Sequence, residues 1–238
     1  MDDIEEFVDE RQKSWCIHCN GYIADLKANH DHVPSRCLLR KPLPRKLPQV
    51  LICKACNQGF APDEEYLAAF LGSVLSGSAD PDRQLYPKVK GILSWNENLR
   101  ARIERSKTEY KTHGGESQIV WKPDSKSINR VVVKNARGHV YFEHGEPILD
   151  EPKRVWSAPL SVLSVEDRTQ FENIDLGPGW PEVGSRMITR LLTGQDLWDG
   201  WIIVQEGIYR YAVVHDGGML VRSVLSEYLA TEVHWENW

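Results

Sequence analysis

Four cysteines stand in two Cys-x-x-Cys pairs near the start of the chain: Cys16, Cys19, Cys53 and Cys56. Two thiolates separated by two residues can bind one ion from a tight turn, and Asn20-Gly21 supplies that turn in the first pair. Four thiolates at one tetrahedral site suit Zn2+, so we predict a structural zinc ion. The alternatives are a redox pair, four unrelated buried thiols, or His18 replacing one cysteine as a ligand. The fifth cysteine, Cys37, is expected to be a partly buried thiol outside the metal site.

Three residues with a different chemistry lie between and just after the cysteine pairs: Asp31, His32 and Asn57. A neutral histidine can take a proton from water near pH 7. Carboxylate and amide oxygens are hard ligands that suit Mg2+ or Mn2+. A metal that neutralises a phosphate, next to a base that activates water, is what hydrolysis of a phosphodiester requires. We interpret the neighbouring His30 as a surface residue on the face of a strand rather than an occasional metal ligand.

The order Cys-x2-Cys, Asp-His, Cys-x2-Cys-Asn resembles the HNH, or ββα-metal, nuclease family, in particular the four-cysteine subtype of phage endonuclease VII. The resemblance covers about residues 12–75. It implies that His32 is the general base and that Asp31 and Asn57 bind one catalytic Mg2+ or Mn2+ at the scissile phosphate. It also implies that the zinc ion is structural and that the products carry 5′-phosphate and 3′-hydroxyl ends. Many members have an Asn-Leu ahead of the second cysteine pair. This chain has Leu47-Pro48-Gln49 there, and Gln49 is the residue that would replace that asparagine.

A basic segment separates the catalytic residues from the second cysteine pair and continues past it. Between Val33 and Ala61 there is no acidic residue, and there are six basic ones: Arg36, Arg40, Lys41, Arg45, Lys46 and Lys54. The whole chain has a net charge of −5, so this local charge of +6 leaves −11 for the remainder. A basic island in an acidic chain favours contact with a polyanion, and we predict that these side chains hold DNA phosphates beside the cut. A solvated loop is the alternative.

The spacing of apolar residues predicts the elements that must position these groups. A short helix is expected over residues 2–14. We expect Asn29–Pro34 on the second strand of a hairpin or at its exit, followed by a proline-broken loop over 36–48. The apolar run Val50–Ile52 leads into the second cysteine pair, and a helix with acids in its first turn follows over 63–75.

The remainder of the chain is predicted to be helical and then β-rich. Residues 79–112 are predicted to be helical with a break near Trp95-Asn96, and a short strand is expected at Gln118–Trp121. Residues 128–142 mix both signals, and we predict a helix there. Its polar residues are expected on the surface: Lys134, Arg137 and His139. Four strands are predicted at the C-terminal end, with a turn at Glu206-Gly207: 186–192, 200–205, 208–214 and 221–235.

Together these elements predict an α+β protein. We expect a zinc-stapled nuclease unit over residues 1–78, a helical connector over 79–115, and a β-rich α+β domain over 116–238 that selects substrate or binds a partner. The 238 residues are 41% hydrophobic and 26% charged, which is typical of globular proteins. There is no run of about 18 apolar residues, and the acidic N-terminus lacks the features of a secretory signal. We therefore expect a cytoplasmic protein with no membrane contact.

The expected function is that of a metal-dependent HNH endonuclease that hydrolyses DNA. The small prokaryotic HNH proteins that this chain resembles act in restriction or anti-phage defence, often beside an ATPase or other sensor subunit, and such a partner is expected by analogy alone. Two alternatives are open. One is a zinc-stabilised module that binds nucleic acid or protein without catalysis. The other is an RNase or structure-specific nuclease with the same centre.

Overall fold

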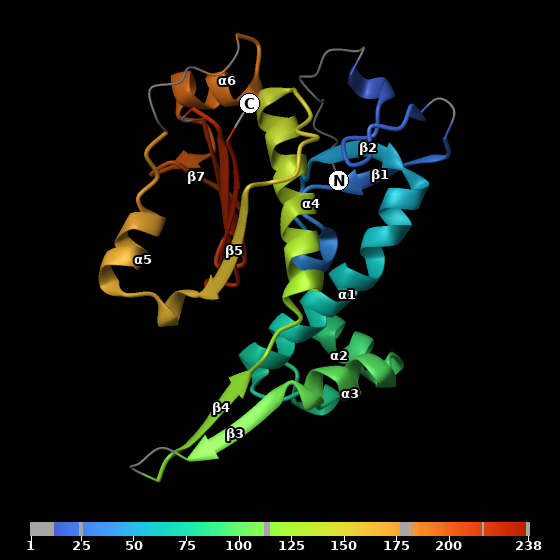
Figure 1. Ribbon diagram of the computed structural model, residues 1–238, viewed down its shortest axis with the longest axis vertical. Helices are drawn as coiled ribbons and strands as arrows, with labels where there is room; N and C mark the ends of the chain where they lie inside the picture. Colours follow the sequence, from blue (N-terminus) through green and yellow to red (C-terminus); the bar gives the residue numbers. More distant parts are fainter. Residues whose placement is uncertain are drawn as a thin grey trace. The chain divides into compact units, whose positions relative to one another are not determined.

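The computed structural model describes residues 12–23, 26–111, 115–176, 181, 183–215 and 217–236. Its six α-helices are α1 (Lys54–Ser76), α2 (Pro87–Trp95), α3 (Glu97–Arg105), α4 (Ser125–His144), α5 (Val165–Glu172) and α6 (Arg186–Thr193) (Figure 1). Its strands are β1 (Ala28–His32), β2 (Gln49–Cys53), β3 (Lys107–Lys111), β4 (Ser117–Trp121), β5 (Arg154–Pro159), β6 (Leu197–Trp198), β7 (Trp201–Gln205), β8 (Tyr209–His215), β9 (Met219–Leu225) and β10 (Leu229–Trp235). The protein is of the α+β class, as predicted, with every described strand paired antiparallel.

The chain divides into two compact units that differ from the predicted domains. One unit comprises Met1–Gly59 and Val132–Trp238, and the other is Phe60–Val131. The boundaries lie inside α1 and α4, whereas the prediction placed them after residues 78 and 115. Loops and glycines marked those predicted ends, but both helices continue without a break from one unit into the other. The cysteine-rich segment and the C-terminal sheet therefore belong to the same compact unit.

A six-stranded antiparallel sheet forms the larger part of the first unit, in the order β5-β10-β9-β8-β7-β6. One face packs against α5, where Phe171 and Trp201 belong to a buried cluster with Ala212. Tyr209 and Tyr211 lie on the other face, because side chains two apart on a strand point to the same side. Both contact His139 of α4, so the sheet lies between α5 and α4 (Figure 1).

The β1–β2 pair is the second sheet of this unit. Its register joins Ala28 to Cys53 and His32 to Gln49. The predicted strand at Val50–Ile52 is confirmed as β2. The strand that carries Asp31 and His32 is the first of this pair, not the second strand of a hairpin as predicted. The helix predicted over 63–75 is confirmed, but it begins at Lys54, directly after β2.

α4 is buried along most of its length, which corrects the prediction for its polar residues. It lies between the β1–β2 pair and the six-stranded sheet (Figure 1), where Gly138 meets Val33 and His139 stacks on Tyr211 at 3.6 Å. The residues expected on its surface have exposed fractions of only 2%, 7% and 1%: Lys134, Arg137 and His139. A helix covered on two sides must bury part of its polar face, and that face is stabilised by hydrogen bonds and ion pairs.

The second unit combines helices with a β3–β4 hairpin. The predicted helices over 79–112 are present as α2 and α3, and Asn96 caps α3 by accepting a hydrogen bond from Leu99 N–H at 3.0 Å. The prediction was wrong at Lys107–Lys111, which is strand β3 and pairs with the predicted strand at Gln118–Trp121. Trp121 packs edge-on against Phe70 with ring centroids 6.4 Å apart.

Of the four predicted C-terminal strands, two are confirmed and two are corrected. β7 and β8 join at the expected turn, where Gly207 has a φ of +67°. The single strand predicted over 221–235 is instead two antiparallel strands, β9 and β10, which are joined by a turn at residues 226–228. The segment predicted as a strand over 186–192 is instead helix α6, capped by Ser185, whose hydroxyl accepts from Ile188 N–H at 3.2 Å.

Two further expectations concern the N-terminal segment and membranes. The helix predicted over 2–14 falls mostly outside the described residues, of which Gln12–Ser14 form a short 3-10 helix. Among the described residues, no helix is both long and apolar enough to cross a lipid bilayer.

Candidate metal centre and nucleic-acid interface

The two cysteine pairs come together as one cluster. The Sγ atoms of Cys16, Cys19, Cys53 and Cys56 all lie within 4.8 Å of one another. Cys16 and Cys53 are buried, whereas Cys19 is exposed and Cys56 is half-buried, so the cluster sits at the rim of the core. Cys37 is half-buried and outside the cluster, as predicted. Four thiolates at this separation fit the tetrahedral coordination of Zn2+, so the cluster could hold a zinc ion.

The turn that carries the first pair depends on its glycine. Cys16 N–H donates to Gly21 O at 2.9 Å, and Asn20 N–H donates to Cys16 O at 2.9 Å. A Cβ atom on Gly21 would lie 2.8 Å from Leu26 Cδ1 and 3.3 Å from Cys19 Sγ. A side chain at this position would push the end of Leu26 aside and press on the Cys19 thiol.

The thiols influence one another in a way that favours a bound cation. Burial raises the pKa of the Cys53 thiol, but the Cys56 N–H at 3.3 Å and the neighbouring thiols lower it by more, so the pKa lies below its ordinary value. The pKa of the Cys56 thiol is raised, first by burial and then by its hydrogen bond with Cys53. Thiolates are the form that binds zinc, and a divalent cation offsets their mutual repulsion.

Asp31 lies on the buried face of β1 and is paired with a lysine from α4. Lys134 Nζ lies 3.0 Å from Asp31 Oδ1 and 2.8 Å from Oδ2. The same ammonium donates to Ser35 Oγ at 2.9 Å. Ser35 donates both its backbone N–H and its hydroxyl to Asn135 Oδ1, each at 3.0 Å. Two adjacent residues of α4 therefore position the end of β1 and the turn that follows it.

His32 is the last residue of β1, and its side chain lies on the opposite face from Asp31, because successive residues of a strand alternate. Its cross-strand partner is Gln49, which places their Cβ atoms about 4.5–5.5 Å apart. Gln49 is the residue predicted to take the place of the family asparagine, and the register brings it beside His32. Because Asp31 and His32 face different ways, a site that uses both must lie at the end of the strand.

Asn57 lies in the first turn of α1, next to Cys56 of the cysteine cluster. It is half-buried, and its side chain makes no hydrogen bond or ion pair with other residues that the structure describes. Its amide oxygen is therefore available as a ligand. The roles predicted for Asp31, His32 and Asn57 remain predictions.

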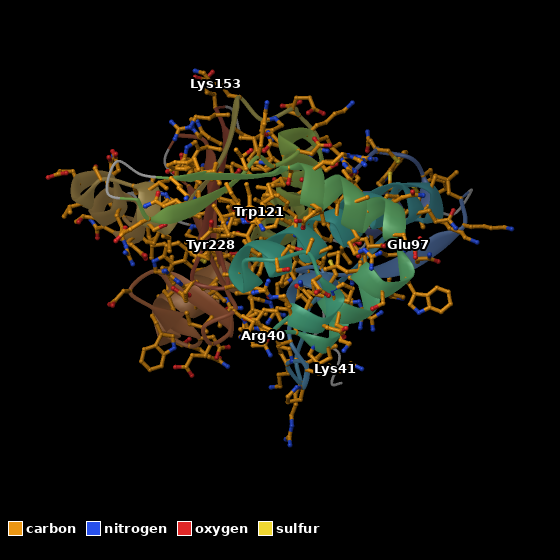
Figure 2. The ribbon with its side chains drawn as sticks, turned by 90° about the horizontal axis from the view of Figure 1, so that it is seen from below. Arg40, Lys41, Glu97, Trp121, Lys153 and Tyr228 are labelled. Carbon is orange, nitrogen blue, oxygen red and sulfur yellow. The ribbon has the colours of Figure 1, made fainter. Side chains whose placement is uncertain are left out.

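Five of the six basic residues lie on the loop between β1 and β2, which is anchored to the six-stranded sheet, and Lys54 is the first residue of α1. Five of the six are exposed, and Arg40 is half-buried. Leu47 is fully buried beneath the loop. Gln205 of β7 accepts from Arg40 N–H at 2.9 Å and donates to Arg40 O at 2.9 Å and to Pro42 O at 3.2 Å. Figure 2 labels Arg40 and Lys41 of this loop. The proposed contact of these side chains with DNA remains a prediction.

Sequence reasoning missed the α4 residues that contact this site, Lys134 and Asn135. One signal pointed to them. They lie between Val131-Val132 and Ala136, and a helix that is apolar on several sides is usually buried. Polar residues inside such a stretch need buried partners.

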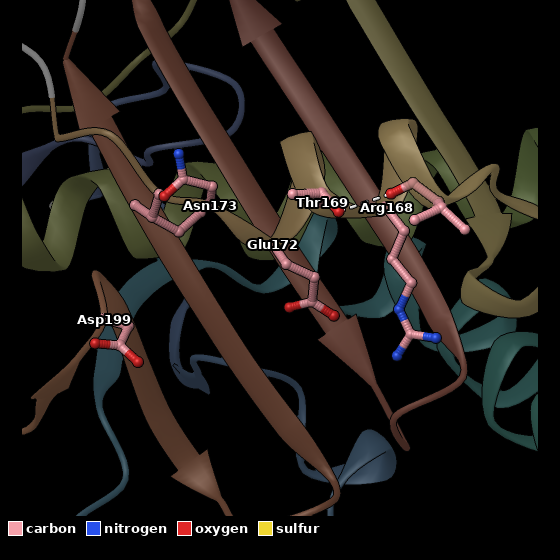
Figure 3. Close-up of a pocket in the computed structure, with 7 residues that line it drawn as sticks. Arg168, Thr169, Glu172, Asn173 and Asp199 are labelled. Carbon is pink, nitrogen blue, oxygen red and sulfur yellow. Dashed lines mark hydrogen bonds between the residues drawn. The ribbon is translucent and has the colours of Figure 1, made fainter.

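A separate pocket of about 770 Å3 lies beside α5 (Figure 3). Figure 3 labels Arg168, Thr169, Glu172, Asn173 and Asp199 in its lining. The carboxylate of Glu172 is already held by Arg210 at 2.7 and 3.0 Å. The pocket contains none of the predicted site residues, so it adds nothing to the candidate site.

Comparison of the chain with protein-family models, with curated proteins and with solved structures finds no match. The function is therefore inferred from the residues and geometry of the site.

Proposed function

We propose that this protein is a metal-dependent nuclease of the HNH type that hydrolyses DNA. The observation that carries the proposal is the meeting of both cysteine pairs in one four-thiol cluster around β1, β2 and the start of α1. Through Cys53 and Cys56 that cluster joins the end of β2 to the helix turn that carries Asn57, and β2 pairs with the strand that carries Asp31 and His32. A bound metal would hold the N-terminal segment, the end of β2 and the start of α1 together at the rim of the core.

Two different metals fit the donor atoms in this proposal. Zn2+ suits the four thiols, and Mg2+ or Mn2+ suits the carboxylate oxygen of Asp31 with the amide oxygen of Asn57. A bound Mg2+ or Mn2+ would neutralise charge on the phosphate and the leaving oxygen. His32 takes the proton from the attacking water, and Gln49 beside it orients the imidazole.

The basic loop supplies the substrate contact in this proposal. Among the described residues, Lys41, Arg45, Lys46 and Lys54 have no ion-pair partner, so their charges are available to phosphates. These contacts carry no base-reading pattern, so we propose weak sequence preference. A role in restriction or anti-phage defence, with an ATPase or sensor partner, is the proposed context by analogy.

A zinc-stabilised binding module without catalysis is the second candidate function. The observation that favours it is the ion pair between Asp31 and Lys134, which already compensates the charge of the predicted metal ligand. In that case the basic loop would bind nucleic acid and no bond would be cut.

Plasmid cleavage with Mg2+ or Mn2+ distinguishes the two candidates. His32→Ala should lower the cleavage rate by about 10²–10⁴-fold, the usual contribution of a general base. His30→Ala is the matched control, because His30 lies two residues away on the same face of β1, and it should stay within about threefold of wild type. If the wild-type protein leaves duplex, single-stranded, branched and RNA substrates all uncut, the binding module is favoured. Cleavage of RNA or branched DNA alone would reassign the substrate.

The zinc component has its own test. Cys16→Ser should release the metal and unfold the N-terminal segment, since a site with three thiolates loses much of its binding free energy. Cys37→Ser is the matched control, because Cys37 is the one cysteine outside the cluster, and it should keep full zinc content. X-ray fluorescence of the purified proteins measures the metal directly. Folded wild-type protein without zinc would refute this component.

A further inference from the structure

Lys134 of α4 and Asp31 of β1 form an ion pair at the edge of the buried interior of the first unit. Its side chain is 1% exposed and that of Asp31 is 11% exposed. The ammonium contacts both carboxylate oxygens, at 3.0 and 2.8 Å, and Ser35 Oγ at 2.9 Å. A lysine buried to this degree persists only when its charge is compensated, and Asp31 supplies the compensating charge.

The same carboxylate is the predicted ligand of the catalytic cation. A lysine ammonium is a compact point charge, as is a hard divalent cation, and both are attracted to carboxylate oxygens. Two cations bound to one carboxylate in a partly buried site repel each other strongly, because the local dielectric constant is low. Binding of one therefore weakens binding of the other.

We propose that Lys134 is a positioning residue that acts as the built-in counter-ion of Asp31 and competes with the divalent cation for this carboxylate. The inference rests on the proposed function only in taking Asp31 as a metal ligand. Before the cation binds, Lys134 holds Asp31 in place and neutralises it. When the cation binds, it takes over part of that carboxylate, so the ion pair sets the cation concentration at which the site fills.

A purely structural role for Lys134 predicts the opposite sign in a binding experiment. If Lys134 only held the site in shape, removing it would disorder Asp31 and weaken cation binding. If it competes, removing it leaves Asp31 without a counter-ion and strengthens cation binding. The direction of the change therefore separates the two roles.

The experiment measures Mn2+ binding to the zinc-loaded full chain by the loss of the free Mn2+ signal in electron paramagnetic resonance. Lys134→Met should bind Mn2+ at least tenfold more tightly than wild type. Lys134→Arg keeps the charge and should stay within about threefold of wild type. The double variant Asp31→Asn with Lys134→Met should lose the gain, because the carboxylate is gone.

Thermal unfolding gives a second readout. The unfolding temperature of Lys134→Met should rise with added Mn2+ by more than that of wild type, since ligand binding stabilises the state that binds. Mn2+ affinity of folded Lys134→Met equal to or weaker than wild type would overturn the proposal. So would a gain in affinity that survives Asp31→Asn, or the absence of Mn2+ binding in every variant.

A milder variant covers the case in which Lys134→Met does not fold. Lys134→Gln removes the charge but keeps a polar side chain that can donate to Asp31 and to Ser35 Oγ, and it should bind Mn2+ at least tenfold more tightly than wild type. Unchanged or weaker affinity in Lys134→Gln would overturn the proposal. Cleavage is not a readout here. Protein that binds Mn2+ as predicted but cuts no substrate refutes only the proposed function, and protein that cuts DNA without these affinity changes refutes only the competition.

Discussion

Two buried ion pairs on the same helix, α4, are built differently. Near its middle, Lys134 holds Asp31 of β1 with one ammonium. Near its end, Glu143 accepts from Arg190 Nε at 2.8 Å, from Arg190 Nη2 at 3.1 Å and from Tyr211 Oη at 2.6 Å. The side chain of Glu143 is 0% exposed, whereas that of Asp31 is 11% exposed.

The difference separates a pair that serves stability from one that leaves room for exchange. A planar guanidinium grips a carboxylate through two parallel hydrogen bonds, and the tyrosine fills a further acceptor position on Glu143. In that arrangement three donors occupy the two carboxylate oxygens of Glu143. The Asp31 carboxylate faces a point charge and reaches the edge of the core, which suits a residue that changes its partner.

The largest expected effect is on the ion pair between Glu143 and Arg190. Arg190→Met leaves the Glu143 carboxylate buried without its cation, which should lower the free energy of unfolding by about 3–5 kcal/mol. Added Mn2+ should not restore the stability of Arg190→Met, whereas it should raise the stability of Lys134→Met. Urea unfolding measures both effects.

The control for this prediction is Arg154→Met, which removes the exposed arginine of the Arg154–Glu232 pair and should cost less than about 1 kcal/mol. A loss below 1 kcal/mol in Arg190→Met, or recovery of its stability with Mn2+, would erase the distinction between the two pairs.

The next effect concerns two buried histidines of α4, His139 and His144. Burial lowers the pKa of His139 from its ordinary 6.5 to about 3, and burial followed by the charge of His215 lowers that of His144 to about 4. The unfolded chain therefore binds more protons than the folded one below about pH 6.5. Above about pH 6.5 these rings do not lower the free energy of unfolding. As the pH falls from there toward 3, each ring lowers it by up to about 1.4 kcal/mol per pH unit.

Urea unfolding between pH 7 and pH 4.5 measures this loss. His139→Gln should flatten the decline, because it removes a ring that the unfolded chain protonates. His30→Gln, at an exposed position on β1, is the control and should leave the slope as in wild type. An identical slope in His139→Gln would contradict the prediction.

A smaller effect is expected where α4 meets β1. A Cβ atom on Gly138 would lie 2.7 Å from Val33 Cγ2 and 3.0 Å from Cγ1, so Gly138→Ala should cost about 1–3 kcal/mol. Adding Val33→Ala should recover part of that loss, which a double-mutant cycle measures. In Gly91→Ala, a helical glycine with open space around it, stability should rise by up to about 1 kcal/mol. Equal effects at both glycines would show that α4 is not packed tightly on β1.

The smallest effect concerns the basic loop, which hydrogen bonds rather than charges attach to the sheet. Gln205→Ala removes three hydrogen bonds to the backbone of Arg40 and Pro42 and should cost about 1–2 kcal/mol. DNA affinity, measured by fluorescence anisotropy, should fall modestly because the loop is held less firmly. Gln195→Ala, at an exposed position, should change neither quantity. If Gln205→Ala lowers stability but leaves DNA affinity unchanged, the basic loop is not part of the DNA interface.

Local spacing was sufficient for the features that depend on neighbours in the chain. The turn at Glu206-Gly207 and the helix over 63–75 were predicted correctly, because short-range geometry governs both, although that helix begins earlier, at Lys54. The strand predicted over 186–192 failed because its alternation was weak, while Ser185 and Gly194 provide caps for a helix. The two compact units divide inside α1 and α4, where neither helix is interrupted, so no local signal in the sequence marks those points.

The sequence by itself determined the donor set of this protein: four thiols in two pairs, an aspartate beside a histidine, an asparagine after the last cysteine, and a basic loop between them. Only the tertiary structure decided that the thiols meet, that Gln49 faces His32, and that Lys134 pairs with Asp31. The physical reason is burial. A lysine in a helix is expected at the surface until the fold covers that helix on two sides, and its charge then has to find a partner more than a hundred residues away.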